Sequence, residues 1–199
     1  MYRVFLASGS PRRHELLRQL GIEFQPLKVD VDESPRPGET APDLVRRLGA
    51  DKAAAGLAAL RQSGQDGHAA VIGADTVVVR DGTVLGKPAD AAEAERMLAS
   101  LSGRAHQVMT SMTLCSNDWA RTRLSISEVR FRALSMAERA AYVATGEPMD
   151  KAGAYGIQGL AGAFVIDLRG SYSGVMGLAL HHVDELLGEV GFTGPARSS

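Results

Sequence analysis

The stretch RVFLASGSPRR, residues 3–13, joins a short apolar run to a polar turn and then to the start of a helix. Residues 3–7 fit a short buried strand, and the small residues 8–10 follow as a loop. Pro11 is tolerated in the first turn of a helix, because its missing N–H would have no partner there, and Ser10 precedes it as the N-cap. A strand, a loop and a helix in this order predict the first step of an α/β fold.

The same alternation continues along the chain. We predict further helices at about 41–61, 91–101, 136–145 and 175–187, strands at 69–74, 106–115, 121–131 and 163–169, and a hairpin within 77–85. Helices that alternate with strands predict an α/β fold with a mixed sheet and flanking helices. No linker is long enough to demand separate domains, so we expect a single domain over residues 1–199 with a frayed tail from about 190.

Composition excludes several classes of protein. Hydrophobic residues make up 45% and charged residues 23%, which excludes a disordered chain. The net charge of -1 and an aromatic content of 5% argue against binding to a nucleic acid polymer. A lone cysteine, Cys115, excludes an internal disulfide framework. No apolar run approaches a membrane span and no signal peptide is found, so we expect a soluble cytoplasmic protein.

The SGSPRR segment, residues 8–13, has the character of a phosphate-binding loop. Free backbone amides at a helix N-terminus and the guanidinium groups of Arg12 and Arg13 suit a phosphate chain. Arginines also occur in first helical turns without any function, and that alternative stays open at this point.

Three further charged residues are candidates, each with a structural alternative. Lys52 shares a helical stripe with Val45 and Leu48, so it points into a functional site or extends its ammonium group to solvent. Glu33 lies in an acidic run that fits either a metal site or a solvated loop. Asp75 follows the apolar strand 69–74, where a carboxylate can act as a base, hold a cation or simply cap a turn.

The segment DKAGAYGIQG, residues 150–159, is rich in glycine, which lets its backbone approach another segment or a ligand closely. Gln158 lies within it, and its carboxamide can donate and accept hydrogen bonds at once. That pairing suits the edge of a uracil or thymine ring.

Taken in order, these segments resemble one family. They are similar to the motifs of the Maf family of nucleoside triphosphate pyrophosphatases. The matching stretches are SGSPRR, VDVDES, an interior DKA, GADT with GKP, LSGRAHQV, SEVRF, GEPMDKAGAYGIQG and GSY. The resemblance covers residues from about 4 to 187. The IQG after DKAGAYG looks like the branch that acts on dTTP and UTP.

The resemblance implies a reaction and a set of site residues. The family hydrolyses nucleoside triphosphates between the α and β phosphates, uses a divalent cation such as Mg²⁺ or Mn²⁺, is cytoplasmic and often forms a homodimer. Its fold is similar to that of inosine triphosphate pyrophosphatases, a twisted sheet in two lobes around a cleft. The residues that match its motifs are Asp75 as proton acceptor, Arg12, Thr76 and Gln158 as substrate-specificity residues, Ser8, Arg13, Lys52 and Lys87 at the phosphates, and Glu33 with Asp75 at the metal.

The sequence departs from the family pattern at Gly174 and Ala179, where many relatives carry Asn and Pro, and at Ser127, where Thr is common. These positions lie outside the charged set. Two alternatives to the proposed activity remain open: the same fold with another base preference, such as 7-methyl-GTP, or a nucleotide-binding regulator of cell division and septum formation.

Overall fold

The computed structural model describes residues 2–192 of the chain. The chain divides into two compact units. The first unit comprises Met1–Asp75, Thr110–Ser125 and Gly177–Ser199, and the second unit comprises Thr76–Met109 and Ile126–Met176.

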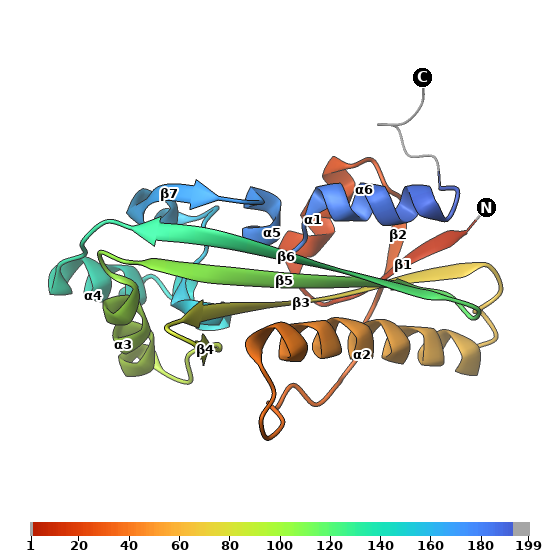
Figure 1. Ribbon diagram of the computed structural model, residues 1–199, viewed down its shortest axis with the longest axis horizontal. Helices are drawn as coiled ribbons and strands as arrows, with labels where there is room; N and C mark the ends of the chain where they lie inside the picture. Colours follow the sequence, from red (N-terminus) through yellow and green to blue (C-terminus); the bar gives the residue numbers. More distant parts are fainter. Residues whose placement is uncertain (1, 193–199) are drawn as a thin grey trace. The chain divides into compact units, whose positions relative to one another are not determined.

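A seven-stranded sheet has the order β2-β1-β3-β5-β6-β7, with β4 paired to β3 (Figure 1). Its strands are β1 (Arg3–Ala7), β2 (Phe24–Leu27), β3 (Ala69–Arg80), β4 (Thr83–Leu85), β5 (Ala105–Cys115), β6 (Ala120–Phe131) and β7 (Val165–Arg169). β1 pairs in parallel with β2 and β3, whereas β3–β4 and β6–β7 are antiparallel. The prediction of an α/β fold with a mixed sheet and flanking helices is confirmed.

The helices begin where the local sequence provides caps. They are α1 (Pro11–Gln19), α2 (Ala41–Gln62), α3 (Ala91–Leu101), α4 (Met136–Ala144), α5 (Tyr172–Met176) and α6 (Leu180–Glu189), with 3-10 helices η1 (Glu147–Asp150), η2 (Ala152–Ala154) and η3 (Leu160–Phe164). Side chains of Thr40, Asp90 and Ser135 accept the N–H three residues on, which satisfies donors that the first helical turn leaves unpaired. Among residues 2–192, no helix is long and apolar enough to cross a membrane.

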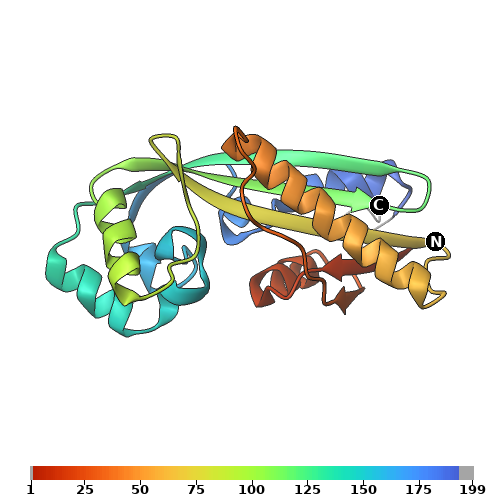
Figure 2. The same cartoon turned by 90° about the horizontal axis from the view of Figure 1, so that it is seen from below.

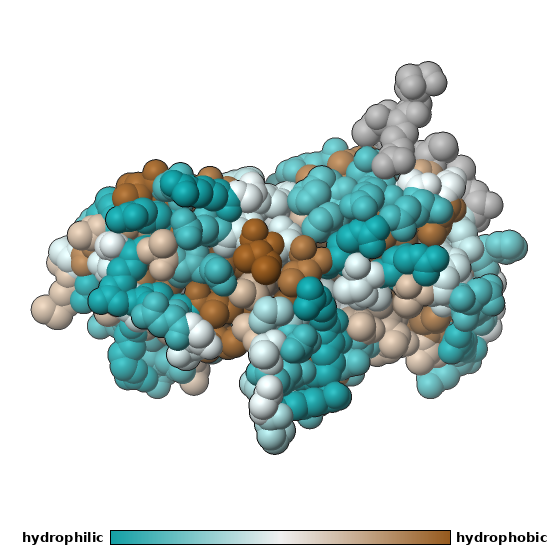
Figure 3. Space-filling view, in the orientation of Figure 1, coloured by the Kyte–Doolittle hydropathy of each residue, from teal (hydrophilic) through white to brown (hydrophobic). Residues whose placement is uncertain are grey.

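The first unit is layered around its strands. α2 lies on one face of them, and α6 lies on the opposite face (Figures 1 and 2). Phe5 of β1, Leu57 of α2 and Val71 of β3 are among the buried residues of the core on the α2 face. Cys115 belongs to the same cluster, as expected for a packed hydrophobic residue, and burial raises its thiol pKa to about 11. The surface over α6 is hydrophilic (Figure 3).

The second unit has its own core. α3 contacts α4 and η2, and an aromatic cluster joins Phe131 of β6 to Tyr155 and Phe164 in edge-to-face contacts. His106 of β5 lies in this cluster and shares a hydrogen bond of 2.8 Å with the Tyr155 hydroxyl. Burial lowers the His106 pKa to about 4, so the ring is neutral near pH 7.

Two predictions about the elements were wrong, and one strand was missed. The strand expected to end at Asp75 continues to Arg80, and its last residues, Val78 to Arg80, pair with β4. The single helix expected over 175–187 is two helices, α5 and α6, separated at Gly177, whose φ of 124° no α-helix contains. The parallel strand β2 was not predicted at all. Residues 193–199 of the expected frayed tail lie outside the described residues.

Candidate functional site

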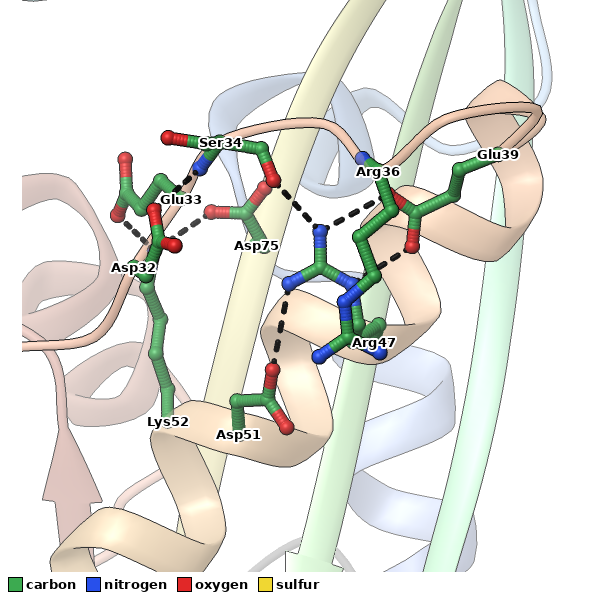
Figure 4. Close-up of polar contacts among 9 residues, drawn as sticks. All are labelled: Asp32, Glu33, Ser34, Arg36, Glu39, Arg47, Asp51, Lys52 and Asp75. Atoms are coloured by element: carbon green, nitrogen blue, oxygen red, sulfur yellow. Dashed lines mark hydrogen bonds and ion pairs between the residues drawn. The ribbon is translucent and has the colours of Figure 1, made fainter.

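Lys52 of α2 is the centre of a charged cluster in the first unit. Its Nζ lies 2.6 Å from Asp75 Oδ1 and 2.6 Å from Glu33 Oε1 (Figure 4). The side chains of Lys52 and Asp75 are each 12% exposed, so both charges are largely removed from water. The alternative of an ammonium group extended to bulk solvent is therefore wrong, and three residues singled out in the sequence meet in space.

The position of Asp75 follows from where its neighbouring strand ends. The parallel pairing of β1 with β3 stops at Ala7 and Gly73, two residues before Asp75. The prediction that Asp75 follows the end of its own strand was wrong, because β3 continues to Arg80. Asp75 does lie just beyond the end of the neighbouring strand β1. Ligands of α/β sheets commonly bind at the carboxyl ends of parallel strands.

Gly73 sets the distance between α2 and β3. A Cβ atom at this position would collide with the backbone nitrogen of Ala53 and the carbonyl oxygen of Gly49. Only a glycine allows the helix backbone to lie so close to the strand. Because Ala53 is next to Lys52, the same approach brings the lysine within reach of Asp75.

The loop that carries Glu33 is tied to α2 by Arg47. Its guanidinium group donates to both carboxylate oxygens of Glu39, at 2.6 and 2.9 Å, and to the Ser34 carbonyl at 3.0 Å (Figure 4). The hydrogen bond from Arg47 to the Glu39 carboxylate is the main reason why the Glu39 pKa is lowered to about 2. The sequence analysis missed this pair. The available signal was the acid Glu39 directly before the helix cap, together with Arg47 inside the helix.

Ser8 and Arg13 form a second set of contacts in the first unit. The buried Ser8 hydroxyl accepts from Arg13 Nη1 and from the Ser10 backbone N–H, both at 3.2 Å. Arg13 Nε donates to the Gly177 carbonyl at 2.8 Å, where the interruption between α5 and α6 leaves that oxygen available. Burial lowers the Arg13 pKa, and the negative charge of Asp75 opposes this effect.

Arg12 adjoins Arg13 in the first turn of α1, and its positive charge also contributes to lowering the Arg13 pKa. The first unit therefore brings together one set of the residues predicted from sequence: Ser8, Arg12, Arg13, Glu33, Lys52 and Asp75.

The carboxylates of the cluster are of the kind that bind a divalent cation. Within residues 2–192, no group of three or more His, Cys, Asp or Glu side chains is arranged to hold a metal by itself. Glu33 and Asp75 nevertheless point carboxylate oxygens at one shared cation, the Lys52 ammonium. Two carboxylates suit a hard ion such as Mg²⁺, which commonly takes its other ligands from substrate phosphates and water. The donor set therefore fits a metal that binds together with a phosphorylated substrate.

The remaining predicted residues, Thr76, Lys87 and Gln158, belong to the second unit. Lys87 is exposed and follows Gly86, whose carbonyl accepts the Gly153 N–H at 2.9 Å. That bond connects the GKP turn to the glycine-rich segment that carries Gln158. Gln158 is itself exposed, so its carboxamide is available to a ligand.

Comparisons with known proteins agree with the motifs. A family model described as Maf-like protein matches residues 3–190. A protein of Aromatoleum aromaticum named dTTP/UTP pyrophosphatase is 50% identical over 199 residues, covering 96% of each chain. Proteins of the same name from Chromobacterium violaceum and Bordetella parapertussis are 49% and 52% identical, covering 97% of this chain and 97% and 95% of their own.

One solved structure, that of the Staphylococcus aureus Ham1 protein, covers 65% of this chain and 71% of its own, with a TM-score of 0.43 and 12% identity. This similarity is too low to support an argument about fold or function.

Proposed function

We propose, from the premise that this chain belongs to the Maf family, that it is a pyrophosphatase of dTTP and UTP. The reaction would cleave the bond between the α and β phosphates and release the nucleoside monophosphate and pyrophosphate. Relatives about half identical over nearly the whole chain carry the name dTTP/UTP pyrophosphatase, which supports this substrate class and a role in removing unwanted nucleotides from the pool.

The observation that carries the proposal is the convergence of Glu33 and Asp75 on the Lys52 ammonium. The Lys52–Asp75 ion pair, whose side chains are each 12% exposed, loses much hydration energy, and a core built for stability alone is served as well by apolar residues. Two carboxylates and a lysine, with Arg13 near them in the first turn of α1 and Arg12 beside it, are instead the groups that a polyphosphate reaction needs.

The phosphate chain is assigned to the basic residues. A nucleoside triphosphate carries about four negative charges near neutral pH, and a protein with a net charge of -1 must offset them locally. We assign this role to Arg12, Arg13 and Lys52, and the resemblance of the GKP turn to the family motif implies the same role for Lys87. The Ser8 hydroxyl accepts a hydrogen bond from the Arg13 guanidinium group. We assign the same hydroxyl to phosphate binding.

Asp75 is assigned as the base. Its carboxylate would accept the proton of the water that attacks the α-phosphorus, while Lys52 orients the carboxylate through Oδ1. Glu33 and Asp75 would also hold the divalent cation, Mg²⁺ or Mn²⁺. When bound, such an ion neutralises phosphate charge and acidifies water. Positioning and charge stabilisation are expected to supply most of the rate, as in other phosphoryl transfers.

Base selection is assigned to Gln158, Thr76 and Arg12. The Gln158 carboxamide can accept the N3–H of uracil or thymine and donate to a neighbouring ring carbonyl. Cytosine lacks that N–H at neutral pH, so a site built for the pair of hydrogen bonds discriminates against it.

We also propose that both units belong to one Maf domain, that the protein acts in the cytoplasm and that it forms a homodimer. The family model supports the first point, since its match runs through both units. Size-exclusion chromatography with light scattering tests the last point.

The proposed reaction is tested by measuring pyrophosphate release from dTTP, UTP, CTP, GTP and 7-methyl-GTP, with Mg²⁺, with Mn²⁺ and with a chelator. We expect dTTP and UTP to be the preferred substrates, pyrophosphate to be the product and the chelator to abolish release. Release of orthophosphate in place of pyrophosphate, or a preference for 7-methyl-GTP, contradicts the proposal. The absence of turnover with every nucleotide would favour a binding regulator.

A further inference from the structure

Gln158 lies at the tip of a tight turn in the second unit. The Gly159 N–H donates to the Gly156 carbonyl at 3.0 Å, which makes Ile157 and Gln158 the two central residues of a β-turn. Ile157 is buried, whereas Gln158 is exposed. The direction of the Gln158 side chain therefore depends on how firmly the backbone of this turn is held.

Tyr142 and Glu147 hold both ends of the turn. At its start, the Gly156 N–H donates to the Tyr142 hydroxyl at 3.3 Å. That hydroxyl donates in turn to Glu147 Oε1 at 2.8 Å. Just past the end of the turn, the Leu160 N–H donates to Glu147 Oε2 at 3.1 Å. One carboxylate, directly and through one phenol, thus connects both ends.

The turn is shaped to receive this carboxylate. A Cβ atom at Gly159 would lie 2.6 Å from Glu147 Cδ, closer than real contacts allow. With a larger residue at this position, the Glu147 carboxylate would have to shift from the place where it accepts the Leu160 N–H.

The two anchoring residues are themselves fixed. Tyr142 is buried in α4, and its ring packs edge-on against Phe164 with 5.2 Å between ring centres. The Glu147 N–H donates to Thr145 Oγ1 at 3.1 Å, and the Glu147 carbonyl accepts from Lys151 Nζ at 2.6 Å. The turn is therefore held by residues that are themselves packed and hydrogen-bonded within the second unit.

We propose that Tyr142 and Glu147 are positioning residues for base selection, which fix the turn 156–159 so that the Gln158 carboxamide meets the pyrimidine edge in one orientation. This inference rests on the proposed function of Gln158. Two aligned hydrogen bonds to a base tolerate little misplacement, because hydrogen bonds weaken steeply with angle. Loosening the turn should therefore cost selectivity before it costs hydrolysis.

The test compares Tyr142→Phe and Glu147→Gln with Gln158→Ala and with the double variant Tyr142→Phe/Gln158→Ala. Phenylalanine keeps the packed ring, and glutamine keeps one acceptor oxygen but cannot accept from both donors. Glu23→Gln, a substitution of an exposed acid in the first unit, is the matched control. kcat and KM are measured separately for dTTP and CTP, and amide exchange is measured at Gly156 and Leu160.

We expect both single variants to raise the KM for dTTP and to lower the dTTP-to-CTP ratio of kcat/KM about tenfold, the order that one lost charge-assisted hydrogen bond gives. kcat with CTP should stay within about twofold of wild type, and exchange at the two amides should accelerate. In the Gln158→Ala background, Tyr142→Phe should lower the ratio no further.

The outcomes separate this inference from the proposed function. If Gln158→Ala removes the preference while Glu147→Gln and Tyr142→Phe leave it intact, the positioning role is wrong and the function of Gln158 stands. If Gln158→Ala keeps the preference, the function of Gln158 is wrong and the inference fails with it. Should Tyr142→Phe not fold, Glu147→Gln decides alone.

Discussion

The ammonium group of Lys52 lies 2.6 Å from the carboxylate of Asp75, although 23 residues separate the two in sequence. Lys52 reaches this position from α2, and Asp75 reaches it from β3. Glu33 contacts the same ammonium group from a loop. The three side chains come from segments that are distant in sequence, so their convergence depends on the packing of α2 against the sheet.

Replacing Lys52 with methionine should weaken the binding of the nucleoside triphosphate. The variant keeps the apolar stem and removes the charge, so the helix should still pack while Glu33 and Asp75 lose their shared cation. We expect kcat/KM for dTTP to fall at least about tenfold, chiefly through a higher KM. Steady-state kinetics measure this. Lys28→Met, at an exposed position, is the control, and wild-type kinetics in Lys52→Met would assign the lysine to structure alone.

Gly73→Ala should separate α2 from β3. The added methyl group would overlap the backbone at Ala53 and Gly49, neither of which can move without the whole helix. Overpacking of this kind costs about 1–3 kcal/mol and occasionally more. We expect a lower Tm together with reduced turnover, because Lys52 moves with the helix.

Gly67→Ala provides the comparison for this variant, since a Cβ atom there meets nothing within 4 Å. Thermal unfolding of both proteins checks the effect. A Gly73→Ala protein with the Tm and kcat of wild type would show that the close approach does not position Lys52.

The pair of Glu39 and Arg47 should make stability depend on pH in the acid range. The Glu39 pKa is about 2 in the folded protein against an ordinary value of 4.5. A carboxylate with a depressed pKa contributes its full stability above pH 4.5 and loses it as the pH falls toward 2. Glu39→Gln should therefore be less stable than wild type at pH 7, and the difference should shrink between pH 4.5 and pH 2.

Denaturant unfolding of wild type and Glu39→Gln at several pH values measures this difference. A difference in the free energy of unfolding that stays constant down to pH 2, or that widens as the pH falls, contradicts the ion pair of Glu39 and Arg47 as described.

Local signals in the sequence predicted most of the elements. The helix starts predicted at about 41, 91 and 136 agree with α2, α3 and α4. These starts are set locally, because each cap (Thr40, Asp90 or Ser135) and the amide that it binds lie three residues apart. The hairpin predicted within 77–85 is formed by the end of β3 and by β4, and its turn at Asp81-Gly82 is likewise local.

What depended on tertiary packing was not predictable in this way. Asp75 was expected to end a strand, but a partner strand extends β3 to Arg80. β2 has only four residues, FQPL, and is held by pairing with β1. The contact of Lys52 with Asp75 also needed the fold, because a lysine on an apolar stripe has the same pattern whether it reaches solvent or a buried acid.

The resemblance to the family motifs predicted more residues of the candidate site than the spacing of residues along helices and strands did. Ser8, Arg13, Glu33, Lys52 and Asp75 were singled out from sequence, and the first unit brings them together. Arg47 and Glu39, which hold the loop of Glu33, were missed because a capped helix start does not by itself show that side chains eight residues apart on either side of it meet.

The assignment of Asp75 as the base is tested most directly by Asp75→Asn, with Asp51→Asn as the matched control. Asp51 also pairs with a cation, Arg47, but on the more exposed side of α2. Pyrophosphate release from dTTP is measured at saturating substrate and divalent cation, with unfolding followed in parallel. We predict that Asp75→Asn stays folded and loses at least about 100-fold in kcat, the range typical of a missing general base, while Asp51→Asn keeps its turnover. A folded Asp75→Asn protein that releases pyrophosphate at the wild-type rate would contradict the assignment.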